Sequence, residues 1–376
     1  MSNQKVKIAV AGAGSFADLW YLPILKRHPS VVVEAICSRK GTNAERLAAK
    51  YDIPSSFNSY QEMLEEDIDG VCIVTPNASH HDIAVLAAEK GIHVMCEKPL
   101  AMDARQAYAM WETAERNAII HGVNFTYREN PAVVRLKELI EEGLIGMVYE
   151  GKFEYSGDYG LSGPPGWRGT CSAGGRGGVL ADLGSHLIDA VHYILGEEIE
   201  EVSASLSCLE NGRMKRLCES ADEDRAADSA FFHASFPSGV RGSFYTSWVS
   251  TQGNRNQTID LMVKGEKGAL QLLSSELGNR LRYAPLRGPW KDINLENIVP
   301  WNDASQPSEE RFRPWRSTEK NEIWKWVDTI LDKKELDRPT FKDGYAVQRV
   351  IDTVLLSDQL RKEAGVKELE KMEESQ

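Results

Sequence analysis

The feature that most constrains the fold of this chain is an apolar run near its N-terminus that leads directly into a glycine-rich turn. Residues 6–11 (Val-Lys-Ile-Ala-Val-Ala) are typical of a buried parallel strand, and residues 12–17 read Gly-Ala-Gly-Ser-Phe-Ala. In this strand, turn and helix context, the first glycine permits a tight turn and the second lets the backbone approach a pyrophosphate. The small Ala17 lets the helix pack closely on the strand, and the helix N-terminus offers free N–H groups to phosphates. We therefore predict a dinucleotide site rather than a flexible surface loop, with Gly12, Gly14, Ser15 and Phe16 at the phosphates.

The second predicted strand, residues 31–37, bears on which dinucleotide binds. NAD enzymes commonly carry an acid at the end of this strand to bind the ribose hydroxyls. Glu34 lies in mid-strand, poorly placed for that role, and the strand end carries Ser38-Arg39-Lys40. Hydroxyl and guanidinium groups suit a 2′-phosphate, which an acid would repel. We expect NADP, with NAD possible, and Ser38 and Arg39 in the cofactor site; a solvated basic turn is the alternative.

Composition excludes several classes of protein. The chain has 376 residues, 42% of them hydrophobic and 27% charged, which allows two globular domains and argues against a disordered or fibrous protein. The net charge of -12 argues against nucleic-acid or anionic-membrane partners. The N-terminus shows no apolar segment long enough for a signal or membrane helix. The six cysteines form no Cys-x-x-Cys pair, so we expect reduced thiols and a cytoplasmic location.

A lysine motif follows a later predicted strand. Residues 92–96 are apolar, and Glu97-Lys98-Pro99 follows them at the carboxyl end, where open α/β sheets bind their ligands. Proline disfavours a helical conformation at the preceding residue, so Lys98 is expected to be extended and aimed at a crevice. The alternative is a surface lysine at an ordinary turn. A neighbouring strand ends in Thr75-Pro76-Asn77, and His80 could line the cofactor pocket beside it, whereas His81 is expected to face solvent.

The pattern changes after about residue 125. Alternating strand-like runs occupy 148–155, 202–209, 230–236, 240–249, 258–263 and 269–273, which predicts a largely antiparallel sheet. The acidic segment 219–228 is expected to be an exposed loop, and two helices are expected at 318–331 and 343–363 before a frayed charged tail. We expect a βαβ dinucleotide-binding domain at 1–125 and an α+β domain on a largely antiparallel sheet at 126–376.

A second constellation lies at the start of a predicted helix. Residues 182–186 read Asp-Leu-Gly-Ser-His, so Asp182 and His186 share a face if the helix has begun by Asp182. An acid beside an imidazole can raise its pKa and fix its orientation, as a proton-transfer histidine requires. The alternative is an ion pair on a helix surface. Asp189 is expected to be structural.

Taken together, these motifs resemble the glucose-fructose oxidoreductase, inositol dehydrogenase and MocA family (Gfo/Idh/MocA). The resemblance rests on the glycine turn, Thr75-Pro76-Asn77 with His80, Glu97-Lys98-Pro99, and the run from Gly178 to His186. It implies a Rossmann domain, an α/β domain whose open sheet serves homo-oligomerisation as a dimer or tetramer, and NAD(P)-dependent oxidation or reduction of a sugar, cyclitol or related polyol. Many family members carry Asp where this chain has Ser38, which supports NADP.

Residue roles follow from the resemblance together with the local chemistry. His186 would be the general base, Lys98 would bind the reacting oxygen, and Asp182 would orient His186 or hold a neighbouring hydroxyl. The expected cofactor site includes Thr75, Pro76, Asn77, His80, Glu97 and Lys98, and the expected substrate wall includes Tyr127, Arg128, Trp167 and Arg168. No metal site is expected. Two rival functions are a hydrolase or lyase that oxidises its substrate only transiently with a bound dinucleotide, and a non-enzymatic NADP(H) sensor.

Overall fold

The computed structural model describes residues 5–163, 165–220, 222–253, 255–276, 278–295, 321–332 and 338–373. The chain divides into two compact units, each described by itself. Unit 1 comprises Met1–Phe125 and Ser317–Tyr345, and unit 2 comprises Thr126–Arg316 and Ala346–Gln376. The first boundary lies between Phe125 and Thr126. Residues 317–345, which the sequence analysis assigned to the second domain, group with unit 1 instead.

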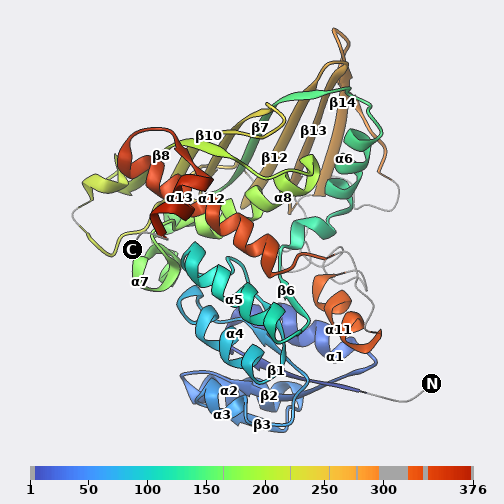
Figure 1. Ribbon diagram of the computed structural model, residues 1–376, viewed down its shortest axis with the longest axis vertical. Helices are drawn as coiled ribbons and strands as arrows, with labels where there is room; N and C mark the ends of the chain where they lie inside the picture. The colour runs from blue at the N-terminus through green and yellow to red at the C-terminus, as the bar shows by residue number, and fades with distance from the viewer. Residues whose placement is uncertain are drawn as a thin grey trace. The chain divides into compact units, whose positions relative to one another are not determined.

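Unit 1 is built on a six-stranded parallel sheet in the order β3-β2-β1-β4-β5-β6 (Figure 1). The strands are β1 (Val6–Ala11), β2 (Val31–Cys37), β3 (Ser55–Phe57), β4 (Gly70–Ile73), β5 (His93–Cys96) and β6 (His121–Val123). Because all neighbours are parallel, every strand ends at the same edge of the sheet. The order reverses between β1 and β4, which is the position where such sheets bind ligands. The predicted Rossmann fold is confirmed.

The helices of unit 1 connect these strands. They are η1 (Ala17–Tyr21), α1 (Leu22–Arg27), α2 (Gly41–Tyr51), α3 (Tyr60–Met63), η2 (Asn77–Ser79), α4 (His80–Glu89), α5 (Ala104–Arg116) and α11 (Glu322–Asp332). Asp103 begins α5 as its N-cap, because its carboxylate accepts the Gln106 N–H at 2.8 Å. The core of the unit joins β1 and β2 to the helix that follows the glycine turn and to Trp326 of α11.

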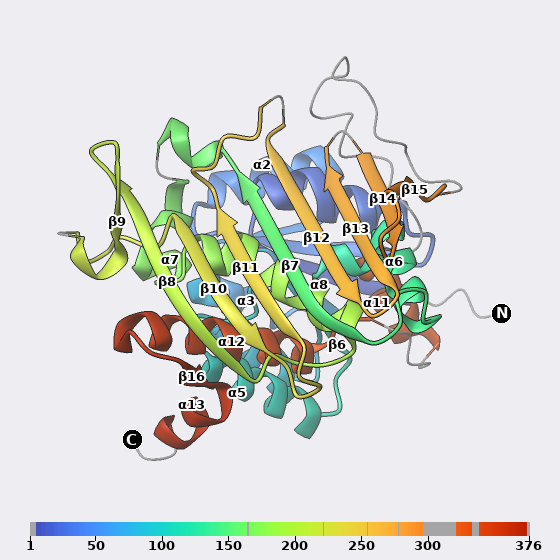
Figure 2. The ribbon, with the colours of Figure 1, turned by 90° about the horizontal axis from the view of Figure 1, so that it is seen from above.

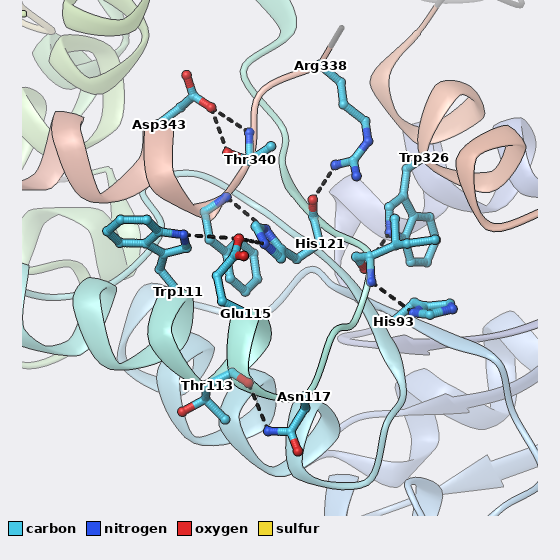
Figure 3. A network of polar contacts seen from close by, with 12 residues as sticks. His93, Trp111, Thr113, Glu115, Asn117, His121, Trp326, Arg338, Thr340 and Asp343 are labelled. Atoms are coloured by element: carbon cyan, nitrogen blue, oxygen red, sulfur yellow. Dashed lines mark hydrogen bonds and ion pairs between the residues drawn. The ribbon is translucent and has the colours of Figure 1, made fainter. Parts of the chain in front are cut away.

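The C-terminal segment of unit 1 is fastened to the strand β6 (Figure 3). Trp326 donates its indole N–H to the carbonyl of Ile120 at 3.3 Å. Arg338 donates to the carbonyl of His121, and the Phe341 N–H donates to His121 Nδ1 at 3.1 Å. These bonds occupy backbone groups around the edge strand that would otherwise need water.

Unit 2 contains a ten-stranded sheet in the order β15-β14-β13-β12-β7-β11-β10-β8-β16, with β9 paired to β8 (Figure 2). The strands are β7 (Val148–Gly157), β8 (Glu201–Glu210), β9 (Arg213–Arg216), β10 (Ser229–Ser235), β11 (Arg241–Ser247), β12 (Gln257–Gly265), β13 (Gly268–Ser275), β14 (Gly278–Pro285), β15 (Lys291–Asp292) and β16 (Ala364–Gly365). The pair β7 and β11 is parallel, and the other pairs are antiparallel. The expected largely antiparallel sheet is confirmed.

One face of this sheet packs against helices. Along β10, Phe232 is buried while Phe231 and His233 point outward and are exposed, as the two-residue period of a strand requires. The helices and short turns of the unit are η3 (Thr126–Glu129), α6 (Pro131–Glu141), η4 (Tyr159–Ser162), η5 (Gly166–Gly169), α7 (Cys171–Gly174), η6 (Leu180–Gly184), α8 (Ser185–Leu195), η7 (Leu217–Glu219), α12 (Phe341–Leu360), which begins in unit 1, and α13 (Val366–Glu373). Helix α6 contacts α8, β13 and β14, and α8 contacts β7.

Some segments differ from the sequence expectation. The acidic segment 219–228 is not wholly an exposed loop, because its last carboxylate, Asp228, is buried and accepts bonds from Trp248 Nε1 at 2.7 Å and the Leu209 N–H at 2.7 Å. Those donors explain why a charge is tolerated there. The charged tail, expected to be frayed, forms α13, and β14 extends the sheet beyond the predicted strands. The first residues of the helix expected at 318–331, residues 318–320, lie outside the described residues.

Candidate functional site

The glycine turn joins β1 to η1 at the carboxyl edge of the unit 1 sheet. Gly12 has a φ of 112°, and a Cβ there would lie 2.5 Å from the carbonyl oxygen of Val74, so a side chain is excluded by backbone. Among the described residues, a Cβ at Gly14 would meet no atom within 4 Å apart from its chain neighbours. Packing within the protein therefore does not require glycine at position 14. A ligand that approaches the backbone closely would require it, because a side chain would occupy the same space. Ala17 is fully buried, as close packing of helix on strand predicts. These residues fit a dinucleotide pyrophosphate.

The end of β2 carries Ser38 and Arg39. Ser38 is half-buried, and its N–H donates to the carbonyl of Phe57 at 3.1 Å, while Arg39 is exposed. Helix α2 begins directly afterwards at Gly41, with no acidic residue in its first turn and no side-chain cap bond at Lys40. A hydroxyl, a guanidinium and a helix N-terminus thus follow one another, and all three favour an anion.

The strand β4 ends in the loop Thr75-Pro76-Asn77. Thr75 and Pro76 are half-buried and Asn77 is buried. His80 opens α4 but does not lie on the surface, since its side chain is fully buried with Nε2 2.9 Å from the Thr75 carbonyl and Nδ1 3.0 Å from the Pro99 carbonyl. Burial lowers the pKa of His80, against the opposing influence of the carbonyl groups. His80 therefore joins two strand-end loops.

The strand β5 ends in Glu97-Lys98-Pro99, as predicted. Lys98 is half-buried and the peptide bond to Pro99 is cis. Glu97 is buried and turned inward: its Oε1 accepts the Tyr21 hydroxyl at 2.9 Å and the Asn124 amide at 2.7 Å. Burial, and secondarily the Glu97 charge, raise the pKa of Tyr21 well above its ordinary value, so its phenol remains a donor. Lys98 lies at the same edge of the parallel sheet as the glycine turn.

In unit 2, Asp182 lies in η6, which continues into α8, so the expected early start of the helix is met. Its Oδ2 accepts the Tyr159 hydroxyl at 2.9 Å, and its Oδ1 accepts Arg168 Nε at 3.3 Å. The Arg168 guanidinium also lies over the ring of Trp167, 4.4 Å from its centroid. Sequence reasoning missed Tyr159, because a tyrosine in a glycine-rich loop gives no periodic signal. The structure brings Trp167, Arg168 and Asp182 together.

His186 lies in the first turn of α8 against two tyrosines. Its ring centroid is 5.4 Å from that of Tyr127, edge to face, and 6.3 Å from that of Tyr155. His186 is 8% exposed, and both tyrosine rings lie near its imidazole. Tyr155 was not expected in the site, although its place at the end of a predicted strand could have pointed to it.

Arg128, expected in the substrate wall, is engaged in a buried ion pair. Its Nε lies 3.1 Å from both carboxylate oxygens of Asp189, and its Nη2 lies 2.6 Å from Oδ1. Asp189 is fully buried, and the guanidinium also lies over the ring of Tyr193. This pair holds η3, which carries Tyr127, against α8 one turn beyond His186. Asp189 is structural, as predicted.

The described residues limit other chemistry. Within them, no group of three or more His, Cys, Asp or Glu side chains could hold a metal ion. Among the helices that the structure describes, none is both long and apolar enough to cross a membrane. The candidate site residues form two sets. One lies at the carboxyl edge of the unit 1 sheet, and the other lies around the start of α8 in unit 2.

Family models match both parts of the chain. Residues 6–125 match the model of an oxidoreductase family with an NAD-binding Rossmann fold, and residues 133–271 match the Gfo/Idh/MocA C-terminal domain. The chain is 37% identical to levoglucosan dehydrogenase of Pseudarthrobacter phenanthrenivorans over 337 residues, covering 84% of each protein. It is 29% identical to scyllo-inositol 2-dehydrogenase (NAD(+)) of Bacillus subtilis over 271 residues, covering 71% of this chain and 74% of that protein.

A solved structure shows the same architecture along the chain. Levoglucosan dehydrogenase in complex with NADH and levoglucosan superposes with a TM-score of 0.80 at 26% identity, covering 96% of this chain and 99% of that one. The fold and the comparisons define an oxidoreductase with a nicotinamide dinucleotide as cofactor. The chain belongs to the Gfo/Idh/MocA family, as its motifs indicated, and it is an NAD(P)-dependent enzyme of the dehydrogenase and reductase type.

Proposed function

We propose that this enzyme transfers a hydride between nicotinamide and a CH–OH carbon of a sugar, a cyclitol or a related polyol or keto sugar. The observation that carries the proposal is the place of Lys98, which follows β5 at the edge of the sheet where the glycine turn lies. Relatives named levoglucosan dehydrogenase and scyllo-inositol 2-dehydrogenase support this class of substrate. Their substrates present both hydroxyl groups and apolar C–H faces.

In the proposed mechanism, the residues of the chain handle the proton and the charge. The bound nicotinamide supplies the hydride acceptor for oxidation and the hydride donor for reduction. His186 accepts the proton of the reacting hydroxyl through its imidazole and returns it in the reverse direction. The Lys98 ammonium donates a hydrogen bond to the same oxygen and stabilises the negative charge that develops there. Asp182, held by Tyr159 and Arg168, binds a neighbouring hydroxyl or orients His186.

We assign the remaining contacts by chemistry. In this proposal Gly12, Gly14, Ser15 and Phe16 hold the pyrophosphate, and Thr75, Pro76 and Asn77 line the cofactor. The substrate, a polyhydroxylated ring, would contact three side chains. These are the aromatic edge of Tyr127, the indole face of Trp167 and the guanidinium of Arg168. Three further residues are expected to act on the site without contacting cofactor or substrate, because their polar atoms bind other groups of the protein. Arg128 binds Asp189, Glu97 binds Tyr21 and Asn124, and His80 faces backbone carbonyls.

We also propose that the enzyme prefers NADP. Ser38 and Arg39 stand where an acid would bind the adenosine ribose, and α2 begins beside them without an acidic residue in its first turn. A 2′-phosphate gains charge-assisted bonds from such groups. The relative scyllo-inositol 2-dehydrogenase (NAD(+)) carries NAD in its name. We therefore expect the NADP preference to come from the residues at the end of β2 in this chain and not from the family as a whole.

The test of function is a screen of sugars and cyclitols with NADP and with NAD, following absorbance of the reduced nicotinamide. We expect substrate-dependent reduction of the cofactor by the wild-type enzyme. Product that forms with only catalytic amounts of dinucleotide, and without net reduction of it, would instead identify a hydrolase or lyase with a transient redox cycle.

A homo-oligomer is part of the same proposal. The outward face of the unit 2 sheet exposes the rings of Phe231 and His233, and charged residues such as Glu150 and Lys264 also lie on this sheet. A second copy of the chain that covers this face would bury those rings. Light scattering coupled to size exclusion is expected to give the mass of a dimer or tetramer, and a monomer at micromolar concentration would contradict it.

A further inference from the structure

Lys98 is flanked on both sides by residues whose polar atoms are tied into the interior of unit 1. Glu97 precedes it with a buried carboxylate, and Pro99 follows it with a carbonyl that faces His80. Each anchor connects the Lys98 loop to a different part of the unit. A lysine ammonium on a flexible four-carbon chain needs such a fixed backbone if it is to meet one oxygen atom repeatedly.

The first anchor is the carboxylate of Glu97. Tyr21, at the end of η1, donates its hydroxyl to Oε1 at 2.9 Å, and Asn124, just beyond β6, donates its amide to the same oxygen at 2.7 Å. The second oxygen, Oε2, accepts the Lys98 N–H at 3.2 Å. A buried carboxylate that lost these donors would carry a large desolvation cost, so the three bonds fix its position.

The second anchor is the imidazole of His80. It is fully buried, and its two nitrogens face carbonyl oxygens of Thr75 and Pro99, which follow β4 and β5. The ring therefore spans two strand-end loops at the edge of the sheet. Because burial lowers the pKa of His80, the ring is neutral and carries one N–H, which donates to one of the two carbonyl oxygens. An apolar side chain of similar size would remove that donor.

We propose that Tyr21, Asn124 and His80 are positioning residues that fix the backbone on either side of Lys98. The catalytic consequence rests on the role of Lys98 in the proposed function. Tyr21 belongs to the same helix that begins at the glycine turn, so the dinucleotide-binding helix and the Lys98 loop share one hydrogen-bonded support.

The chain offers a matched control in His121 (Figure 3). His121 is also buried and also joins two segments, since Nε2 lies 3.1 Å from Glu115 Oε1 and Nδ1 accepts the Phe341 N–H at 3.1 Å. However, it begins β6, at the opposite end of its strand from the edge that carries Lys98. If removing a buried histidine affected only the stability of the protein, His80→Leu and His121→Leu would have the same effect.

The experiment compares Tyr21→Phe, His80→Leu and His121→Leu in the full-length enzyme. With the sugar that the wild type oxidises, Tyr21→Phe and His80→Leu are expected to lower kcat about 10-fold or more, while KM and the NADPH Kd change by less than about 3-fold. His121→Leu is expected to lower the thermal midpoint and leave kcat within about 2-fold of the wild type. Tyr21→Phe removes one hydroxyl only and keeps the test open if His80→Leu does not fold.

A second measurement is independent of turnover. Reductive methylation with ¹³C-formaldehyde gives each lysine an NMR signal, and the Lys98 signal is the one that disappears in Lys98→Arg. We expect this signal to shift in Tyr21→Phe and not in His121→Leu. An unshifted signal together with wild-type kcat in Tyr21→Phe and His80→Leu would overturn the positioning role, as would an equal effect of His121→Leu. A shifted signal in an enzyme that oxidises no sugar or polyol would instead reject the proposed function alone.

Discussion

The hydroxyl of Tyr159 donates to the carboxylate of Asp182 at 2.9 Å, and Arg168 holds the other oxygen of that carboxylate at 3.3 Å. Burial, together with the Asp182 charge, raises the pKa of Tyr159 far above its ordinary value, so the phenol stays protonated and donates at every working pH. One rotamer of Asp182 is thus favoured before substrate arrives.

Tyr159→Phe is expected to weaken catalysis without removing any group that contacts the cofactor. A hydrogen bond to a charged group contributes roughly 1.5 to 3 kcal/mol, so kcat/KM should fall by about one to two decades. Steady-state kinetics with the identified sugar measures kcat/KM, and a titration with NADPH checks that cofactor binding is unchanged. Unchanged kcat/KM would show that Asp182 needs no support from the phenol.

Arg128→Met is expected to destabilise the protein by about 3 to 5 kcal/mol, because it leaves the buried Asp189 carboxylate without its partner. The matched control is Arg135→Met, which breaks exposed pairs with Glu138 and Glu142 and should cost at most about 1 kcal/mol. Urea unfolding gives both values. Equal small losses would mean that the Arg128 pair behaves as a surface pair.

His121 is expected to make stability depend on pH. Burial lowers the pKa of His121 in the folded state below its ordinary value of 6.5. As pH falls below 6.5, the unfolded chain therefore binds the proton before the folded chain does, and stability is lost. Protonation at Nδ1 would also remove the acceptor for the Phe341 N–H. Urea unfolding at pH 7.5 and 5.5 should show a smaller difference in His121→Leu than in the wild type, and the same difference in both would exclude this histidine as the cause.

Cofactor preference is expected to reside at the end of β2. The double change Ser38→Asp with Arg39→Ala replaces a hydroxyl and a guanidinium by a carboxylate that repels a 2′-phosphate. The ratio of kcat/KM for NADP to that for NAD should fall by about one to two decades, since one charge-assisted contact of roughly 1.5 to 3 kcal/mol is lost. A ratio that does not move would reject the assignment.

The glycine turn, the Lys98 motif and the Asp182 to His186 run were predictable because each is a local pattern. A tight turn, a strand end and a helix face are fixed by residues close together in sequence. Unit 1 also follows from alternation of apolar strands and helices. The short strand β3 gives no such signal, because Ser55 and Ser56 are residues typical of turns.

Long-range partners could not be predicted in the same way. Residues 321–332 and 338–345 belong to unit 1 because Trp326 bonds to Ile120 and Arg338 bonds to His121, some two hundred residues earlier in the chain. The burial of Asp228 likewise depends on an indole in a later segment. The place of His80 in the first turn of a helix at the cofactor edge of the sheet is a local feature. Its two carbonyl partners come from separate strand ends that no local pattern relates.

The central claim is that His186 accepts the substrate proton while Lys98 stabilises the oxygen that loses it. The most direct test is kcat of His186→Ala across the pH range with the identified substrate. We expect kcat of His186→Ala to fall by about 10²- to 10⁴-fold, with a smaller change in KM. In the double variant His186→Ala with Lys98→Met, the fall in kcat should be much smaller than the product of the falls in the two single variants. Near-normal turnover of His186→Ala across that range would contradict the account and place the proton acceptor elsewhere.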